Sequence, residues 1–99
     1  MIVVVFRIRL NPGVEKEFYE RLEEMVELAS KEATGLRGFK AYKSDDGELA
    51  YVIEWDNEEN LSAWRNHPGH RIAVGEGREK FYASYTIQIC QEQRRSEFP

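Results

Sequence analysis

The chain has 99 residues, a length that accommodates one domain and excludes two independent cores. Its composition, 41% hydrophobic and 12% aromatic, is that of a globular protein rather than a disordered one. The net charge is −4 and the basic residues are dispersed among acidic ones, which argues against a nucleic-acid-binding face.

Membrane and disulfide chemistry are also disfavoured. No apolar run approaches the ~18 residues that a membrane span needs, and the apolar residues 1–6 lack the basic leader and cleavage site of a signal peptide. We therefore interpret residues 1–6 as part of a first strand and expect a cytoplasmic protein. Cys90 is the only cysteine, which excludes an internal disulfide and a thiolate metal cluster.

The first predicted elements are a strand and a long helix. Apolar residues alternate over residues 2–10 and share one face: Ile2, Val4, Phe6, Ile8 and Leu10. Asn11 is expected to cap the following helix, with Pro12 at its first position. Apolar residues at helical spacing continue to Ala33, and Gly35 is placed to end the helix.

A hairpin and a second helix follow. Residues 39–44 predict a strand, residues 45–47 a tight turn, and the alternation of residues 49–55 a third strand. Asp56 is expected to be the N-cap of the second helix, with Glu59 at the capping-box spacing. Leu61 and Trp64 share one face of that helix.

The second helix is interrupted at residues 67–68 and continues irregularly to about residue 78, loosened by Gly75 and Gly77. A fourth strand begins near residue 80, with Tyr82 expected on the opposite face from Tyr85. We expect residues 1–92 to form the domain and residues 93–99 a polar tail.

The order βαββαβ predicts an α+β, ferredoxin-like fold in which two helices cover one face of a four-stranded antiparallel sheet. The other face combines apolar with charged residues, among them Val3, Val5, Arg7, Arg9, Tyr42, Ala50, Val52, Glu54, Tyr82 and Cys90. Such a face is too apolar to leave in water, so we predict a homodimer that packs two of these sheets into a barrel.

Several motifs resemble one known family. They are Arg7 before Asn11-Pro12-Gly13, then Gly38-Phe39, Glu54-Trp55, Leu61-Ser62-Ala63-Trp64, His67-Pro68-Gly69-His70 and Phe81-Tyr82-Ala83-Ser84-Tyr85. With these motifs, residues 1–92 resemble the antibiotic biosynthesis monooxygenase family of dimeric α+β barrel proteins. The family includes cofactor-free oxygenases of phenols and quinols, and haem-degrading enzymes.

The resemblance implies roles for some residues and argues against others. Trp55 stands where the polyketide-oxidising members have a tryptophan that lines the substrate pocket, but Tyr51 replaces an asparagine of their proposed chemistry. Trp64 matches a tryptophan of the haem-degrading members. Val74 stands in place of their iron-ligating histidine and Phe6 near their strand-one asparagine, which argues against haem degradation by that site.

Candidate site residues each keep two interpretations. Trp55 and Trp64 either pack in the core or also line a pocket. His67 either caps a helix or faces solvent, whereas His70 is the candidate for removing a phenolic proton. With no cysteine nearby and no obvious third ligand, the two histidines do not predict a metal site.

Charged and hydroxyl groups offer further candidates. Arg7, Arg9 and Glu54 are expected to meet on the second sheet face, as a dimer-interface ion pair or as an anion-binding group. The hydroxyls of Tyr51, Tyr82 and Tyr85 can bind a ligand, although cross-strand aromatic packing is the alternative. Cys90 is expected to be inert.

The predicted function is a cofactor-independent monooxygenase for a small phenol- or quinol-type aromatic substrate. The substrate would contact Trp55, Trp64, Tyr51, Phe6 and Phe39, and His70 would act as the base. No motif for a flavin, nucleotide or metal is present, so no cofactor is expected. The alternatives are a non-catalytic dimeric module that binds a small ligand and, less well supported, a haem-binding relative.

Overall fold

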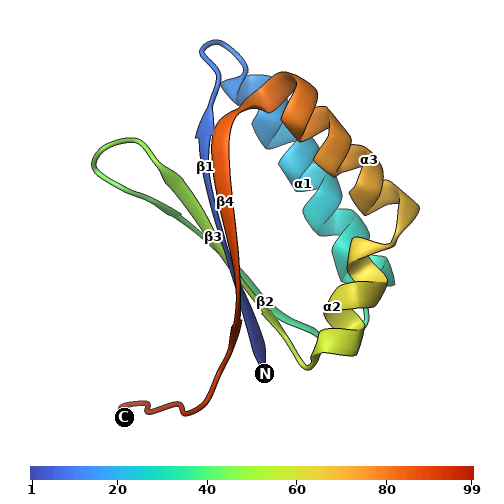
Figure 1. Cartoon of the computed structure of the whole chain (residues 1–99), viewed down its shortest axis with the longest axis vertical. Helices are drawn as coiled ribbons and strands as arrows, with labels where there is room; N and C mark the ends of the chain where they lie inside the picture. Colours follow the sequence, from blue (N-terminus) through green and yellow to red (C-terminus); the bar gives the residue numbers. More distant parts are fainter.

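The computed structural model describes all 99 residues (Figure 1). The strands are β1 (Ile2–Leu10), β2 (Leu36–Lys43), β3 (Leu49–Trp55) and β4 (Tyr82–Gln91). The helices are α1 (Glu15–Glu32), α2 (Glu58–Arg65) and α3 (Pro68–Glu76), and α3 continues into a π-helical turn, η1 (Gly77–Phe81). The predicted α+β class and element order are confirmed, with the second helical segment divided at His67.

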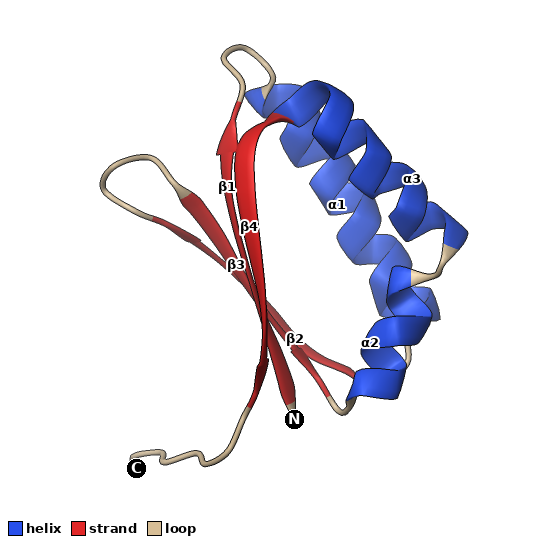
Figure 2. Ribbon diagram, in the orientation of Figure 1, coloured by secondary structure: helices blue, strands red, loops and turns tan.

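The strands form one antiparallel sheet in the order β2-β3-β1-β4, and all helices lie on one side of it (Figure 2). In the middle of the sheet, Phe6 of β1 lies opposite Tyr51 of β3 and Ile87 of β4. Because side chains alternate along a strand, residues that pair across the sheet share a face. These three residues therefore face the helices.

Two clusters of buried side chains hold the helices against the sheet. The tryptophan cluster lies where β1 begins and β3 ends, and contains Ile2, Val4, Ala29, Trp55, Leu61 and Trp64. The aromatic cluster lies toward the other end and contains Ile8, Phe18, Leu49, Tyr51 and Phe81. Half-buried Ile53 packs against both. The alternation that predicted the third strand thus supplies residues to both clusters.

The first helix begins later than predicted. Gly13 has a φ of 85°, a left-handed conformation that no helical turn contains, and α1 starts at Glu15. Asn11 instead connects the loop to the end of η1, directly before β4. Its backbone N–H donates to the Phe81 carbonyl at 2.8 Å, and its side-chain amide donates to the Lys80 carbonyl at 3.1 Å. The predicted positions of Asn11 and Pro12 were therefore wrong.

The N-cap of α2 lies one residue later than predicted. The side chain of Asn57 accepts the Asn60 N–H at 2.9 Å. Asp56 is ion-paired with Arg37 of β2, and its N–H donates to the Gly35 carbonyl at 2.8 Å. Asp56 therefore joins the end of β3 to the chain that enters β2, and the next residue caps the helix.

A bulge at the start of β4 changes the face of Tyr82. Ser84 lies opposite Arg9 and Tyr82 lies opposite Leu10, so the pairing shifts between these two positions of β1. The Tyr82 ring lies 5.6 Å from that of Phe6, on the side of the helices. The prediction that Tyr82 shares the uncovered face with Ser84 was wrong, because the extra residue of a bulge reverses the alternation.

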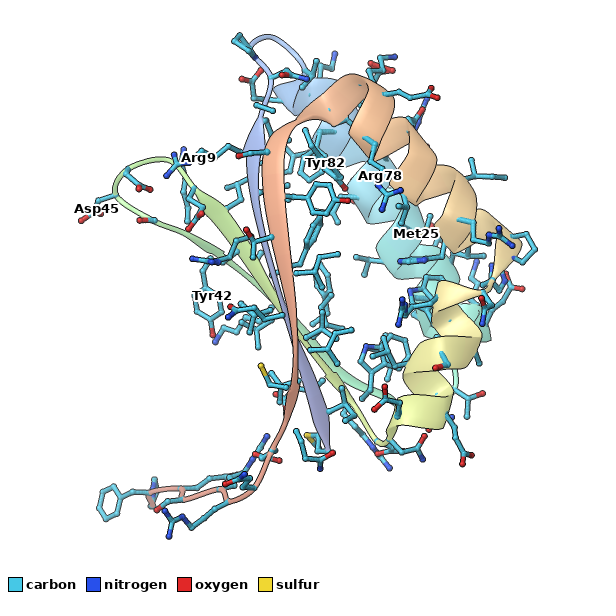
Figure 3. The ribbon with its side chains drawn as sticks, viewed as in Figure 1. Arg9, Met25, Tyr42, Asp45, Arg78 and Tyr82 are labelled. Atoms are coloured by element: carbon cyan, nitrogen blue, oxygen red, sulfur yellow. The ribbon has the colours of Figure 1, made fainter.

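No helix covers the second face of the sheet, which we call the open face. Its residues are Val3, Val5, Arg7, Arg9, Gly38, Lys40, Tyr42, Ala50, Val52, Glu54, Ser84, Thr86, Gln88 and Cys90. Arg9 and Tyr42 project from the sheet on the side away from the helices (Figure 3). Residues 92–99 form no helix or strand. None of the helices has the length and hydropathy that crossing a membrane requires.

Candidate functional site

Both tryptophans lie in the tryptophan cluster and are nearly inaccessible. Trp55, the last residue of β3, is 2% exposed, and Trp64 of α2 is 8% exposed. The alternation of β3 directs Trp55 toward the helices, and helical spacing places Leu61 with Trp64 on the buried face of α2. The strand-to-helix corner is therefore packed core, and a ligand-binding role for the two indoles stays a prediction.

Two histidines flank the Trp64 ring, with centroids 5.2 Å away for His67 and 5.4 Å away for His70. Nδ1 of His67 accepts the Gly69 N–H at 3.0 Å, and its Nε2 lies 3.2 Å from Oε1 of Glu32. A neutral imidazole with its proton on Nε2 satisfies both contacts. His67 therefore caps α3, one of the two roles considered for it.

His70 differs from His67 because its Nδ1 is buried without a hydrogen-bond partner. Burial lowers the pKa of His70 below its usual value, and the backbone of Arg65 only partly opposes this effect. The ring is thus uncharged at neutral pH. Since buried polar atoms are seldom left unpaired, His70 is the histidine with a ring nitrogen that lacks a partner, and this nitrogen is enclosed by protein atoms.

The predicted substrate residues Phe6, Tyr51 and Phe39 come together in and beside the aromatic cluster. The rings of Phe39 and Tyr51 are stacked at 5.6 Å, and those of Phe6 and Tyr51 are 6.4 Å apart. Burial raises the pKa of Tyr51, so its phenol stays protonated. The structure thus separates the predicted site into two groups, since Trp55 and Trp64 belong to the tryptophan cluster.

The helix-facing side of β4 is incompletely covered. Tyr85, Ile87 and Ile89 share the face of the buried β1 residues beside them, yet they are 38%, 51% and 44% exposed. Together with their neighbours Phe6 and Tyr82 we call these residues the β4 strip. Partly exposed aromatic and aliphatic side chains on the inner side of a sheet form a surface that suits an aromatic ring.

Polar groups border this strip. Figure 3 shows Tyr82 and Arg78 between the sheet and the helices, on the same side as Met25 of α1. Nε of Arg78 donates to the Tyr85 hydroxyl at 2.9 Å, and the guanidinium carbon lies 5.8 Å from the Tyr85 ring centroid. Burial raises the pKa of Tyr82 to about 12, so that its hydroxyl is a donor at neutral pH.

The π-helical turn η1 positions these groups. Gly77 is buried against the Tyr82 ring, and a Cβ at this position would overlap that ring. Phe81, at the other end of η1, is 2% exposed and packs on Phe18 with 5.8 Å between centroids. Both ends of the turn are therefore anchored while Arg78 lies between them. Such π turns in helices often occur at functional sites.

Three charged residues that were expected to meet on the open face pair with other groups. The pairs are Arg7 with Glu48 at 4.0 Å, Arg9 with Asp46 at 2.7 Å, and Glu54 with Arg95 of the tail at 2.5 Å. Within one protomer Arg7, Arg9 and Glu54 do not contact one another, because they occupy separate positions along the sheet. Their role in a dimer or in anion binding stays a prediction.

Two surface hollows have polar linings. One is bounded by Gln91, Gln93 and Arg94, and the other by Ser62, Arg65 and Asn66. Neither offers the apolar surface that an aromatic ligand requires. No group of three or more His, Cys, Asp or Glu side chains is arranged to hold a metal ion. The β4 strip with its polar border is therefore the candidate site.

Sequence reasoning missed Arg78. Arg78 lies between a helix and a strand. Neither the helical nor the strand periodicity therefore predicts which way its side chain points. The available signal was the pair Gly75 and Gly77 directly before a strand, which indicated an irregular helix but not which side chain it would present.

The sequence profile of the antibiotic biosynthesis monooxygenase family matches residues 1–76 of the chain. The chain belongs to this family. The matched region includes β1 to β3 and all three α-helices, and the β4 strip is formed in part by residues that follow it.

Individual proteins are similar to the chain in sequence or in fold. The chain is 32% identical over 79 residues to the uncharacterized protein YqjZ of Bacillus subtilis (strain 168), covering 80% of this chain and 68% of that protein. It is similar to the structure of Rv0793 from Mycobacterium tuberculosis, with a TM-score of 0.82, 18% identity, and 97% and 98% of the two chains covered. A structure described as antibiotic biosynthesis monooxygenase gives a TM-score of 0.79 at 12% identity, with 95% and 100% covered. These structures establish the fold, and they confirm the ferredoxin-like arrangement.

Proposed function

We propose that this protein is a cofactor-independent monooxygenase that oxidises a small aromatic substrate of the phenol or quinol type. The observation that carries the proposal is the partly exposed β4 strip, in a chain of a monooxygenase family. Phe6 and Ile87 supply apolar contacts for a ring, and the hydroxyls of Tyr82 and Tyr85 supply hydrogen bonds for its oxygen.

The proposed reaction takes its electrons from the substrate. Loss of the phenolic proton gives an electron-rich anion that reduces O2. One oxygen atom bonds to the ring carbon opposite the hydroxyl, the O–O bond breaks, and the second oxygen leaves as water with the hydrogen of that carbon and the phenolic proton. Phenol plus O2 therefore gives quinone plus water, which balances atoms and electrons without a further reductant.

In this proposal His70, which lies beside Trp64 rather than on the β4 strip, accepts the phenolic proton through intervening water. It is uncharged at neutral pH because burial lowers its pKa, and its Nδ1 has no competing partner. The same lowered pKa makes it a weak base, so the hydroxyls of Tyr82 and Tyr85 must stabilise the anion that forms. Trp64, in contact with the His70 ring, would form the closed and dry end of the site.

Oxygen uptake with a panel of phenols and quinols tests the proposal. Under ¹⁸O2, one labelled atom is expected in the quinone and one in water. His70→Gln is expected to lower kcat by about 100-fold or more. Arg71→Gln, a change at an exposed residue of the same helix, is expected to leave kcat unchanged. If the panel binds but no member consumes oxygen, the monooxygenase is excluded.

A non-catalytic ligand-binding module is the second candidate function. It is favoured by the protonation of the site, since burial lowers the pKa of His70 and raises that of Tyr82, which keeps both groups neutral. Such groups bind a ligand by hydrogen bonds without a strong base. Binding of phenols with no oxygen uptake would support this module.

We also propose a homodimer in which two open faces pack together. In support, the open face carries Val3, Val5 and Val52, and no helix covers it. Sedimentation is expected to give twice the protomer mass of 11.6 kDa. Val5→Asp is expected to shift the protein toward the protomer, whereas Val5→Thr, of similar shape, should do so less. A wild-type species of 11.6 kDa at micromolar concentration would contradict the dimer.

A further inference from the structure

We infer that the β4 strip binds an aromatic ligand that carries a carboxylate, and that Arg78 binds this carboxylate. The inference concerns the ligand of the proposed site. That this ligand is also oxidised rests on the proposed function, whereas its binding does not. It starts from an arginine that has no acidic partner at the edge of an apolar, aromatic surface.

Arg78 differs from the arginines that form ion pairs, which are Arg7, Arg9, Arg21, Arg37 and Arg95. It shares the lack of an ion pair with Arg65, Arg71 and Arg94, but of these four only Arg78 is held by a side-chain hydrogen bond. Arg78 instead donates through Nε to the neutral hydroxyl of Tyr85. Its two terminal Nη groups make no hydrogen bond and no ion pair, in a chain whose net charge is −4. They are available to a ligand.

The Arg78 side chain is also held in place, which favours ligand binding. Both ends of η1 are anchored, at Gly77 by the Tyr82 ring and at Phe81 by the aromatic cluster. Arg78 lies between these anchors, and its exposed side chain is on the helix side of the sheet, where Nε is held by the Tyr85 hydroxyl (Figure 3). A cationic group held in this way binds an anion at a lower entropy cost than a freely moving surface arginine.

The chemistry around Arg78 favours an aromatic acid over a small inorganic anion. The strip from Tyr85 to Ile89 spans five residues, about 13 Å of strand, which accommodates a ring with its substituents. The two Nη groups of a guanidinium match the two oxygens of a carboxylate. Tyr85 accepts from Nε of Arg78 and keeps its own O–H to donate. The nearby carboxylate of Glu76 is paired with Arg21 at 3.3 Å, so it does not compete.

Titration calorimetry with two matched probes, 4-hydroxybenzoate and 4-hydroxybenzamide, tests the inference. The probes differ in charge but hardly in shape. The wild-type protein is expected to bind the acid about tenfold more tightly than the amide, because a carboxylate and a guanidinium form charge-assisted hydrogen bonds through two pairs of atoms. Arg78→Gln is expected to abolish this preference. Arg71→Gln removes the same charge from an exposed position of α3 and is expected to retain it.

Arg78→Lys provides a second variant that keeps the charge and loses the planar fork, and it is expected to retain only part of the preference. Equal affinity for acid and amide in the wild type would overturn the inference, as would equal losses in Arg78→Gln and Arg71→Gln. Arg78-dependent binding of 4-hydroxybenzoate, together with no oxygen uptake by any member of the panel of phenols and quinols, would support the inference and exclude the monooxygenase. Oxygen uptake with neutral phenols but no preference for the acid would exclude the inference and leave the monooxygenase standing.

Discussion

The tryptophan cluster and the β4 strip occupy the same layer between helices and sheet, yet they are covered to different extents. Trp55 is 2% exposed, whereas Ile87 is 51% exposed. The difference arises because α2 follows β3 directly and packs on its end, while β4 is an edge strand that the helices leave at the margin. In this protein the largest aromatic residues stabilise the fold, and smaller side chains at an uncovered edge offer the binding surface.

The largest expected effect concerns the tryptophan cluster. Trp55→Ala removes a buried indole and leaves a cavity, so we expect the free energy of unfolding to fall by about 3–5 kcal/mol in urea denaturation. Trp55→Phe retains a ring and should lose much less. If Trp55→Ala lowers the free energy of unfolding by less than about 1 kcal/mol, the tryptophan cluster is not tightly packed.

A smaller effect is expected where η1 meets the β4 strip. A Cβ at Gly77 overlaps the Tyr82 ring, so Gly77→Ala should destabilise the protein by about 1–3 kcal/mol and weaken aromatic ligand binding as the ring moves. Gly75→Ala is the matched control, since no atom lies within 4 Å of its Cβ and alanine favours a helix. Equal effects of the two substitutions would show that the contact with Tyr82 does not position the strip.

The histidine at the edge of the tryptophan cluster should make stability depend on pH. Burial lowers the pKa of His70 in the native state, so as pH falls below about 6.5 the unfolded chain binds a proton before the native protein does. The free energy of unfolding should therefore decrease on acidification, by at most about 1.4 kcal/mol per pH unit from this group. His70→Gln should flatten this part of the profile. If His70→Gln leaves the pH dependence of the free energy of unfolding unchanged, the His70 ring is as exposed to solvent as the side chains of the β4 strip.

The smallest effect on stability is expected within the β4 strip. Ile87→Ala shortens a side chain that is already half exposed, so the loss should be about 1 kcal/mol or less. The affinity of the Ile87→Ala variant for 4-hydroxybenzoate should nevertheless fall. Val4→Ala, a change at a buried position of β1 on the same face, is the control and should destabilise more. If the two losses in stability are equal, the strip is core and the contrast between the two regions disappears.

The sequence predicted best the features that depend on neighbouring residues. The bounds of β1 and the alternation of β3 agree with the structure, because one buried face imposes a period of two on a strand. The start of α1 and the face of Tyr82 were predicted wrongly. In both cases a partner far along the chain decides the outcome: Asn11 bonds to the end of η1, and the bulge in the β1–β4 pairing turns Tyr82.

The amino-acid sequence by itself determined the order of helices and strands and the apolar faces of β1 and β3, because local propensity and periodicity are properties of a linear chain. The resemblance of its motifs indicated the family. The tertiary structure alone decided that Trp55 is enclosed, that Tyr85 and Ile87 are left partly open, and that Arg78 has no acidic partner. Burial and ion pairing depend on distances between residues far apart in the chain, and only the packing of the helices over the sheet sets those distances.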